Sequence, residues 1–170
     1  MLGVFIAPRK RVANPRGFAY GIGMKIALSA DHAGVDLKDA LVAWLKNDGH
    51  DILDLGTHGH DSVDYPRFGA ALAEALADGR ATRGITICGS GIGVAIAANR
   101  NPACRCAQVS EPLSASLARQ HNDANAIALG ARLIGLDMAK ACVTAFLTTE
   151  FLGGRHERRV GMLNHDEVSA

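Results

Sequence analysis

The sequence lacks several features that would mark particular classes of protein. No apolar run approaches the roughly 20 residues that a membrane-spanning helix needs. Eighteen lysines and arginines face 17 acidic residues, and the net charge of +1 gives no bulk electrostatic reason to expect nucleic acid or a membrane as partner. Only five prolines accompany nineteen glycines, which favours a fold with many strand-to-helix turns. A length of 170 residues suits one domain with a real core.

Cysteines are few, and none of them has the setting of a disulfide framework. All four (Cys88, Cys104, Cys106 and Cys142) fall within strand or helix patterns rather than loops. We therefore expect reduced thiols and a cytoplasmic protein.

Acidic residues are missing from the first 23 positions, which hold four basic residues. A secretory signal would place its positive charges before its apolar stretch, whereas here the apolar residues 2–6 come first and are too few. We expect residues 1–23 to be a dispensable extension or the product of an early start codon, with a subunit-contacting tail as the alternative. Residues 24–170 are expected to form a single domain that ends in a basic tail.

Strand patterns alternate with amphipathic helix patterns from Met24 onward. The strands are expected at 25–29, 51–55, 83–88, 104–109 and 126–129. Helices are expected between them and at 136–148, followed by a Gly153-Gly154 break. This alternation predicts βαβ units and therefore an α/β protein: a Rossmann-like three-layer sandwich whose five-stranded parallel sheet has helices on both faces.

The segment ICGSGIGVAIAAN, residues 87–99, is the most informative part of the chain. A buried strand ends at Cys88, glycines occupy every second position from 89 to 93, and a helix pattern follows. Amide groups at such a helix N-terminus have no intrahelical partner and attract anions. They also stabilise a thiolate, so Cys88 can exchange a proton near neutral pH, and Ser90 adds a hydroxyl inside the turn. The segment predicts chemistry on an anion at the carboxyl end of a strand, where ligands bind in parallel sheets.

A dinucleotide-binding turn is the competing interpretation of this segment. The spacing is G-x-G-x-G rather than G-x-G-x-x-G, and the turn follows the third strand rather than the first. In favour of a nucleotide, Glu111 lies about 20 residues further on, where a ribose-binding acid would be expected.

Two other pairs of residues have the spacing of metal ligands. Cys104 and Cys106 point to one face of a predicted strand, and we interpret them, like Cys142 on its helix, as core residues. His58 and His60 lie in a glycine-rich polar loop, where solvated histidines are commoner than zinc ligands.

Four segments in register carry a resemblance to a known family: SADHAG at 29–34, ICGSGIGVAIAAN at 87–99, SEPLSASLARQHNDAN at 110–125 and GGRHERRV at 153–160. Together they resemble the ribose-5-phosphate isomerase B type of the ribose/galactose sugar-phosphate isomerase family, over residues 24 to about 160. The resemblance implies a Rossmann-like sheet and a homodimer, often a dimer of dimers, with active sites shared between subunits. It also implies that no metal or organic cofactor is used.

The reaction implied by this resemblance is the interconversion of ribose 5-phosphate and ribulose 5-phosphate, a step of the pentose phosphate pathway. In this family Cys88 would be the base that moves a proton between C2 and C1, although some members instead have a glutamate at the position of Val94. Ser90 and the amides of Gly89, Gly91 and Gly93 would stabilise the enediolate, and His121 would open the sugar ring. The remaining matches are substrate-binding (Asp31, His32, Tyr65 and Asn122) or phosphate-binding (Arg132, Arg155, His156 and Arg159).

Other interpretations of these residues remain open at the level of sequence. The same chemistry could act on allose 6-phosphate, galactose 6-phosphate or a tetrulose phosphate, and a non-catalytic nucleotide-binding module is the alternative from another class. Taken singly, His121 could interact with a helix dipole, Tyr65 could be simple packing, and the basic residues 155–159 could be a solvated tail.

Overall fold

The structure is a computed structural model that describes residues 23–163. The expected N-terminal extension, apart from residue 23, and the last seven residues of the expected basic tail lie outside the described range. None of the helices within that range has the length and apolarity needed to cross a bilayer.

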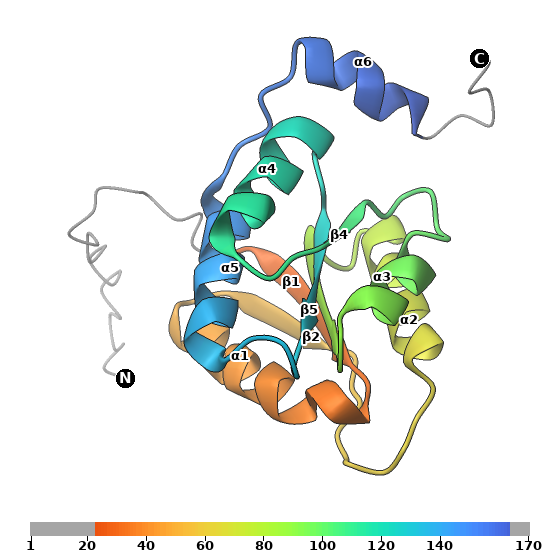
Figure 1. The fold of residues 1–170 in the computed structure, drawn as a ribbon, viewed down its shortest axis with the longest axis vertical. Coiled ribbons are helices and arrows are strands. Elements are labelled where there is room, and N and C mark those ends of the chain that lie inside the picture. The colour runs from red at the N-terminus through yellow and green to blue at the C-terminus, as the bar shows by residue number, and fades with distance from the viewer. Residues whose placement is uncertain (1–22, 164–170) are drawn as a thin grey trace, which may run out of the picture.

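Five parallel strands form one sheet in the order β2-β1-β3-β5-β4 (Figure 1). The strands are β1 (Lys25–Ala30), β2 (Asp51–Asp54), β3 (Arg83–Cys88), β4 (Cys106–Gln108) and β5 (Ala126–Gly130). The helices are α1 (Val35–Asn47), α2 (Tyr65–Ala77), α3 (Ile92–Ala98), α4 (Pro112–Asn122), α5 (Leu136–Thr148) and α6 (Arg155–Met162), with a 3₁₀ turn at His32–Gly34 before α1. The predicted fold class and all five strands are confirmed.

The sheet separates two apolar cores of different character. Large side chains of the central strands, such as Ile85 and Leu129, face α1, α4 and α5. Small ones, such as Ala126 and Ala128, face α2 and α3. The two helices on the small-residue side lie very close together, because a Cβ added at Gly69 would come within 2.6 Å of the Val94 carbonyl oxygen. Helices thus cover both faces of the sheet, as predicted for a three-layer sandwich (Figure 1).

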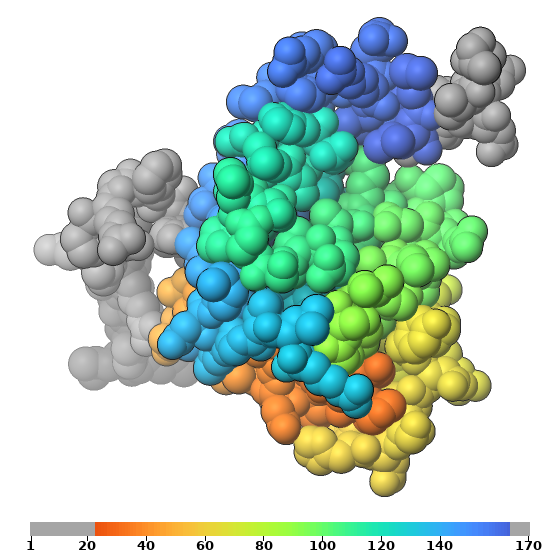
Figure 2. All heavy atoms as spheres, in the orientation of Figure 1, coloured from red at the N-terminus to blue at the C-terminus, as the bar shows by residue number. Residues whose placement is uncertain are grey.

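The structure corrects two predictions about elements. The fourth strand is shorter than the predicted 104–109, because the amides of Cys104 and Arg105 bond to Asn101 and to the Asn125 side chain instead of a neighbouring strand. The residues after Gly154 are a helix, α6, and not merely a tail. This helix packs on α4 and forms one end of the molecule (Figure 2).

Candidate active site

The turn after β3 holds the cysteine and its nearest donors. The Cys88 side chain is buried, and its Sγ accepts a hydrogen bond from the Gly91 amide at 3.1 Å. The Ser90 Oγ lies 4.0 Å from the sulfur and accepts from the Ile92 amide at 3.3 Å. The turn therefore supplies a thiol, a hydroxyl and oriented amides in one place.

Glycine is required at position 91 for two independent reasons. Its φ of 77° lies in the left-handed region, where a side chain is strained. A Cβ at this position would also come within 2.9 Å of the Leu129 carbonyl carbon on the neighbouring strand. The turn thus packs closely against β5, and its Gly91 amide points at the cysteine sulfur.

Arg132 and Tyr65 lie on either side of this turn. A Cβ at Gly89 would be 3.3 Å from the Arg132 Nε, and the Arg132 amide bonds to the Gly89 carbonyl at 3.0 Å. At Gly93 a Cβ would be 2.6 Å from the Tyr65 ring, so the ring packs directly on that glycine. A guanidinium and a phenol thus border the cysteine turn.

Asp31 and His32 follow β1, the strand next to β3 in the sheet. The Asp31 amide bonds to the Ile87 carbonyl at 3.1 Å, so this segment lies beside the end of the cysteine strand. The Asp31 carboxylate accepts from the Ala33 amide at 2.9 Å, and the His32 Nδ1 accepts from the Val63 amide at 3.2 Å. We call the group at this edge of the sheet the cysteine cluster: Asp31, His32, Tyr65, Cys88, Gly89, Ser90, Gly91, Gly93 and Arg132.

His121 and Asn122 lie at the opposite edge of the sheet, where the strands begin rather than end. They end α4, which runs back from the carboxyl end of β4, and the Asn122 carbonyl accepts from Arg105 just before β4 begins. The Gly84 amide bonds to the Asn125 carbonyl at this edge, while Cys88 pairs with Gly130, five residues further along β5. At about 3.3 Å per residue, five residues span about 16 Å.

Residues of α6 join His121 at this second edge. The rings of His121 and His156 stack with centroids 4.4 Å apart and an interplanar angle of 7°. Burial lowers the pKa of His156, and the positive charges of His121, Arg155 and Arg159 lower it further. We call His121, Asn122, Arg155, His156 and Arg159 the histidine cluster. Its members come together in the fold, but within one chain the length of the strands, about 16 Å, separates them from the cysteine cluster.

Two pairs with metal-ligand spacing do not form a metal site in the described part of the chain. Residues 23–163 contain no group of three or more histidines, cysteines and carboxylates placed to hold an ion. Cys104 and Cys106 belong to the core, as predicted, and burial raises the pKa of Cys104 to about 11. The side chains of His58 and His60 are each 71% exposed.

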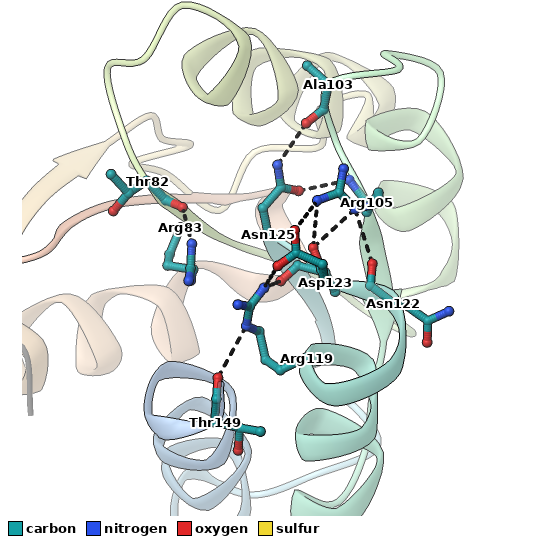
Figure 3. A network of polar contacts seen from close by, with 10 residues as sticks. Thr82, Arg83, Ala103, Arg105, Arg119, Asn122, Asp123, Asn125 and Thr149 are labelled. Atoms are coloured by element: carbon teal, nitrogen blue, oxygen red, sulfur yellow. Dashed lines mark hydrogen bonds and ion pairs between the residues drawn. The ribbon is translucent and has the colours of Figure 1, made fainter. Parts of the chain in front are cut away.

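Glu111, the expected ribose-binding acid of a dinucleotide site, has another role. Its carboxylate accepts from the amides of Leu113 and Ser114 and caps the start of α4. A polar network behind the histidine cluster, in which Arg105 and Arg119 hold Asp123, was not predicted from the sequence (Figure 3).

Comparison with known proteins decides the family. A family model described as Ribose/Galactose Isomerase matches residues 26–163, which include all the helices and, apart from Lys25 at the start of β1, all the strands of the fold. The chain belongs to this isomerase family. The resemblance carried by the four sequence segments is therefore confirmed.

Individual members of the isomerase family are similar over nearly their whole length. The ribose-5-phosphate isomerase B of Escherichia coli is 46% identical over 136 residues, covering 80% of this chain and 91% of the relative. The solved ribose-5-phosphate isomerase B of Clostridium thermocellum is 48% identical, with a TM-score of 0.82, and the match covers 83% of this chain and 95% of that one. The D-erythrulose-4-phosphate isomerase of Pectobacterium atrosepticum is 39% identical over 149 residues, covering 85% and 97%.

Proposed function

We propose that this isomerase interconverts ribose 5-phosphate and ribulose 5-phosphate. Support comes from the two relatives at 46% and 48% identity that carry that activity in their names. The single observation that carries the chemistry is the cysteine turn, where the Gly91 amide points at the Cys88 sulfur and Arg132 lies against Gly89.

In the proposed mechanism Cys88 takes the proton from C2 and returns it to C1. A base suits this task when it can gain and lose a proton near the working pH, and such positioned proton transfer contributes roughly 10²- to 10⁴-fold in rate. Position 94, where some family members have a glutamate base, is a buried valine here and provides no competing carboxylate. The Ser90 hydroxyl and the amides of the turn would stabilise the enediolate oxygens, each donor contributing about 3 kcal/mol.

The histidine cluster supplies the other proposed roles. His121 would open the sugar ring, with Asn122 binding the substrate beside it. Arg155, His156 and Arg159, together with Arg132, would hold the phosphate, for which guanidinium groups provide matching donors. These roles come from the resemblance to the family.

Both clusters can act on one substrate only if two chains combine, because within one chain they lie at opposite edges of the sheet. We therefore propose a homodimer in which each site takes its cysteine cluster from one subunit and its histidine cluster from the other. An apolar surface beside the cysteine turn supports this arrangement. Ile92 and Ile96 on α3 are 54% and 55% exposed, and they line a hollow that reaches Gln108 on the edge strand β4.

Replacement of Cys88 by alanine tests the proton-transfer step. We expect Cys88→Ala to lose essentially all isomerisation while it still binds ribose 5-phosphate, because the change removes only the base. Turnover would be followed by a coupled assay and binding by calorimetry. Cys142→Ala, at a buried cysteine on α5 far from the turn, is the matched control and should keep its turnover. Unchanged turnover in Cys88→Ala would discard the mechanism.

The choice among sugar phosphates needs a separate experiment. One relative is named for D-erythrulose 4-phosphate, so a four-carbon substrate is a specific alternative. The ratio of kcat/KM for ribose 5-phosphate, allose 6-phosphate and D-erythrulose 4-phosphate measures differential transition-state binding. We expect ribose 5-phosphate to have the highest value. A nicotinamide nucleotide that raised the melting temperature when pentose phosphate did not would favour a nucleotide-binding module instead.

A further inference from the structure

Asp123 follows the histidine cluster directly in the chain and has an unusual backbone conformation. It is the C-cap of α4, with φ 43° and ψ 42°, and among residues 23–163 it is the one residue other than glycine with a positive φ. The left-handed region costs free energy for a side chain, although aspartate and asparagine tolerate it better than most residues. Such strain persists only where surrounding contacts hold it in place.

Two arginines from different elements hold Asp123 (Figure 3). One carboxylate oxygen accepts from the Arg105 Nη2 at 2.7 Å, and the other accepts from the Arg119 Nη1 at 2.7 Å. Arg105 also donates from Nε to the backbone carbonyls of Asn122 and Asp123, both at 3.1 Å. The side chain and the backbone of the turn are thus fixed together. We call Arg105, Asp123 and Arg119 the arginine clamp.

The clamp is anchored in the body of the fold. The Arg119 side chain is only 4% exposed and donates to the carbonyls of Ala124 at 2.7 Å and Thr149 at 3.4 Å. The Arg105 amide is held at 2.8 Å by Asn125, the residue before β5. These contacts connect the end of α4 to the sheet and to the end of α5.

The charge balance around Asp123 makes its carboxylate the centre of this arrangement. Burial lowers the pKa of nearby Arg83, the positive charge of Arg119 lowers it further, and Asp123 and Glu150 oppose both effects. The guanidinium groups of Arg105 and Arg119 both hydrogen-bond the Asp123 carboxylate. Charge-assisted hydrogen bonds of this kind are short and strongly dependent on geometry.

The last turn of a helix normally frays, yet His121 and Asn122 stand in the last turn of α4. Functional side chains must be held within roughly 0.5 Å of their working geometry. The stacking partner His156 cannot provide this alone, because α6 itself packs chiefly on α4. We propose that the arginine clamp is a positioning device that holds His121 and Asn122 in place for opening the sugar ring.

This inference rests on the proposed function, and the test separates the two. Ribose 5-phosphate is a cyclic hemiacetal in water, whereas ribulose 5-phosphate is open-chain because its 5-hydroxyl carries the phosphate. Exchange of the C1 proton of ribulose 5-phosphate with D₂O, followed by NMR, therefore reports Cys88 chemistry without ring opening. Conversion of ribose 5-phosphate requires both steps.

The decisive variant is Asp123→Gly, because glycine accepts the left-handed backbone and the change removes only the clamp. We expect kcat/KM for ribose 5-phosphate to fall by roughly tenfold to a hundredfold, as for a small misplacement of a reacting group. Proton exchange at saturating ribulose 5-phosphate, where weaker binding by Asn122 does not limit the rate, should stay within about twofold. Asp123→Asn keeps one of the two acceptor oxygens, so it can accept from one arginine only and should restore part of the lost activity.

Two further variants complete the design. Asp78→Gly changes the aspartate that caps α2 and should alter neither rate, because it lies outside both clusters. Arg105→Gln removes one arm of the clamp from a partly exposed position, and it decides the matter if Asp123→Gly fails to fold. Equal losses in conversion and exchange, or no loss in conversion, would overturn the positioning role. Proton exchange that persisted in Cys88→Ala would instead overturn the proposed function, because it would show that another group moves the proton.

Discussion

Backbone amides engage the carboxylates of two residues that follow strands at the same edge of the sheet as Cys88. Asp31 accepts from the Ala33 amide, and Glu111 accepts from the amides of Leu113 and Ser114. The hydrogen bonds from Ser114 and Leu113 hold the pKa of Glu111 below its usual value. Carboxylates that cap turns and helices are poor proton carriers, since protonation would break the cap. Cys88 is therefore the group at this edge of the sheet that we expect to move protons.

His50 gives a prediction about stability at the same scale. This side chain is buried, and its Nδ1 has no hydrogen-bond partner among residues 23–163. Burial lowers the pKa of His50, an effect that Asp48 partly opposes. The unfolded chain therefore takes up this proton at a higher pH than the folded one. The neutral His50 ring therefore contributes to the free energy of unfolding at pH values above the ordinary histidine pKa. This contribution is lost as the pH falls from the ordinary pKa to the lowered pKa of the folded protein.

We expect His50→Leu to lose less stability than the wild type between pH 7.5 and pH 5, because the substituted side chain binds no proton. Urea unfolding at the two pH values measures this difference. His60→Gln, at a side chain that is 71% exposed, is the control and should follow the wild type. An unchanged pH dependence in His50→Leu would contradict the prediction.

At the scale of elements, a buried ion pair connects α1 to the end of β2. The Lys38 side chain is fully buried, and its Nζ donates to both oxygens of Asp54 at 3.0 and 2.8 Å. The Asp54 carboxylate also accepts from the Gly56 amide, and the Gly56 carbonyl accepts from the Ala30 amide. The pair therefore supports the backbone just before Asp31.

Lys38→Met should destabilise the fold by roughly 3–5 kcal/mol, because it leaves Asp54 in a partly buried site without its cation. Burial raises the pKa of Asp54, but the hydrogen bonds from Lys38 and Gly56 outweigh that effect and lower the pKa overall. The wild-type pair thus contributes stability above the ordinary aspartate pKa and loses it as the pH falls through the lowered value.

Chemical denaturation of Lys38→Met should therefore show its largest deficit near neutral pH and a smaller one in acid, where the carboxyl group becomes protonated. Asp39→Asn removes the charge of the second carboxylate that contacts Lys38. Because the Asp39 side chain is 58% exposed, this change should lower the free energy of unfolding by less than about 1 kcal/mol. A deficit that did not depend on pH would argue against the charge as its cause.

The elements also show where sequence patterns succeed and fail. The runs around Ile26, Ile85 and Ile127 predicted their strands correctly, because each is buried on both faces of the sheet. The helix α6 was not predicted because its sequence has no apolar stripe. His156 is the one buried residue among positions 155–162. The start of β4 depends on the side chain of Asn125, which a local pattern does not contain.

At the scale of the whole molecule, the two clusters make a clear prediction about subunit exchange. Cys88→Ala and His121→Ala should each be inactive alone. When the two variants are refolded together, each mixed dimer would contain one site with both an intact cysteine and an intact histidine. Random pairing would then restore roughly a quarter of the wild-type sites.

Isomerase activity of the refolded mixture measures this complementation. The matched control is Cys88→Ala refolded with the double variant Cys88→Ala/His121→Ala, which contains no intact cysteine and should stay inactive. Activity that remained at the background level in the first mixture would exclude shared sites. Ile96→Glu, in the exposed apolar face of α3, should abolish both pairing and activity.

The site was predictable from the sequence only in part. Because the carboxyl ends of adjacent parallel strands meet, the strand pattern alone brought Asp31 and Cys88 together. The histidine cluster came from the resemblance, since no local pattern shows that α4 and α6 meet. The arginine clamp could not be predicted from the sequence, because Arg105 and Asp123 are 18 positions apart and meet only through the tertiary fold.

The hydrogen bond received by His32 restricts what that ring can recognise. The Val63 amide can only donate, so the Nδ1 that accepts from it carries no hydrogen. In the neutral tautomer the remaining hydrogen must then reside on Nε2. The imidazole can consequently present only a donor to a bound molecule, so it selects for an oxygen with a lone pair and against an incoming N–H.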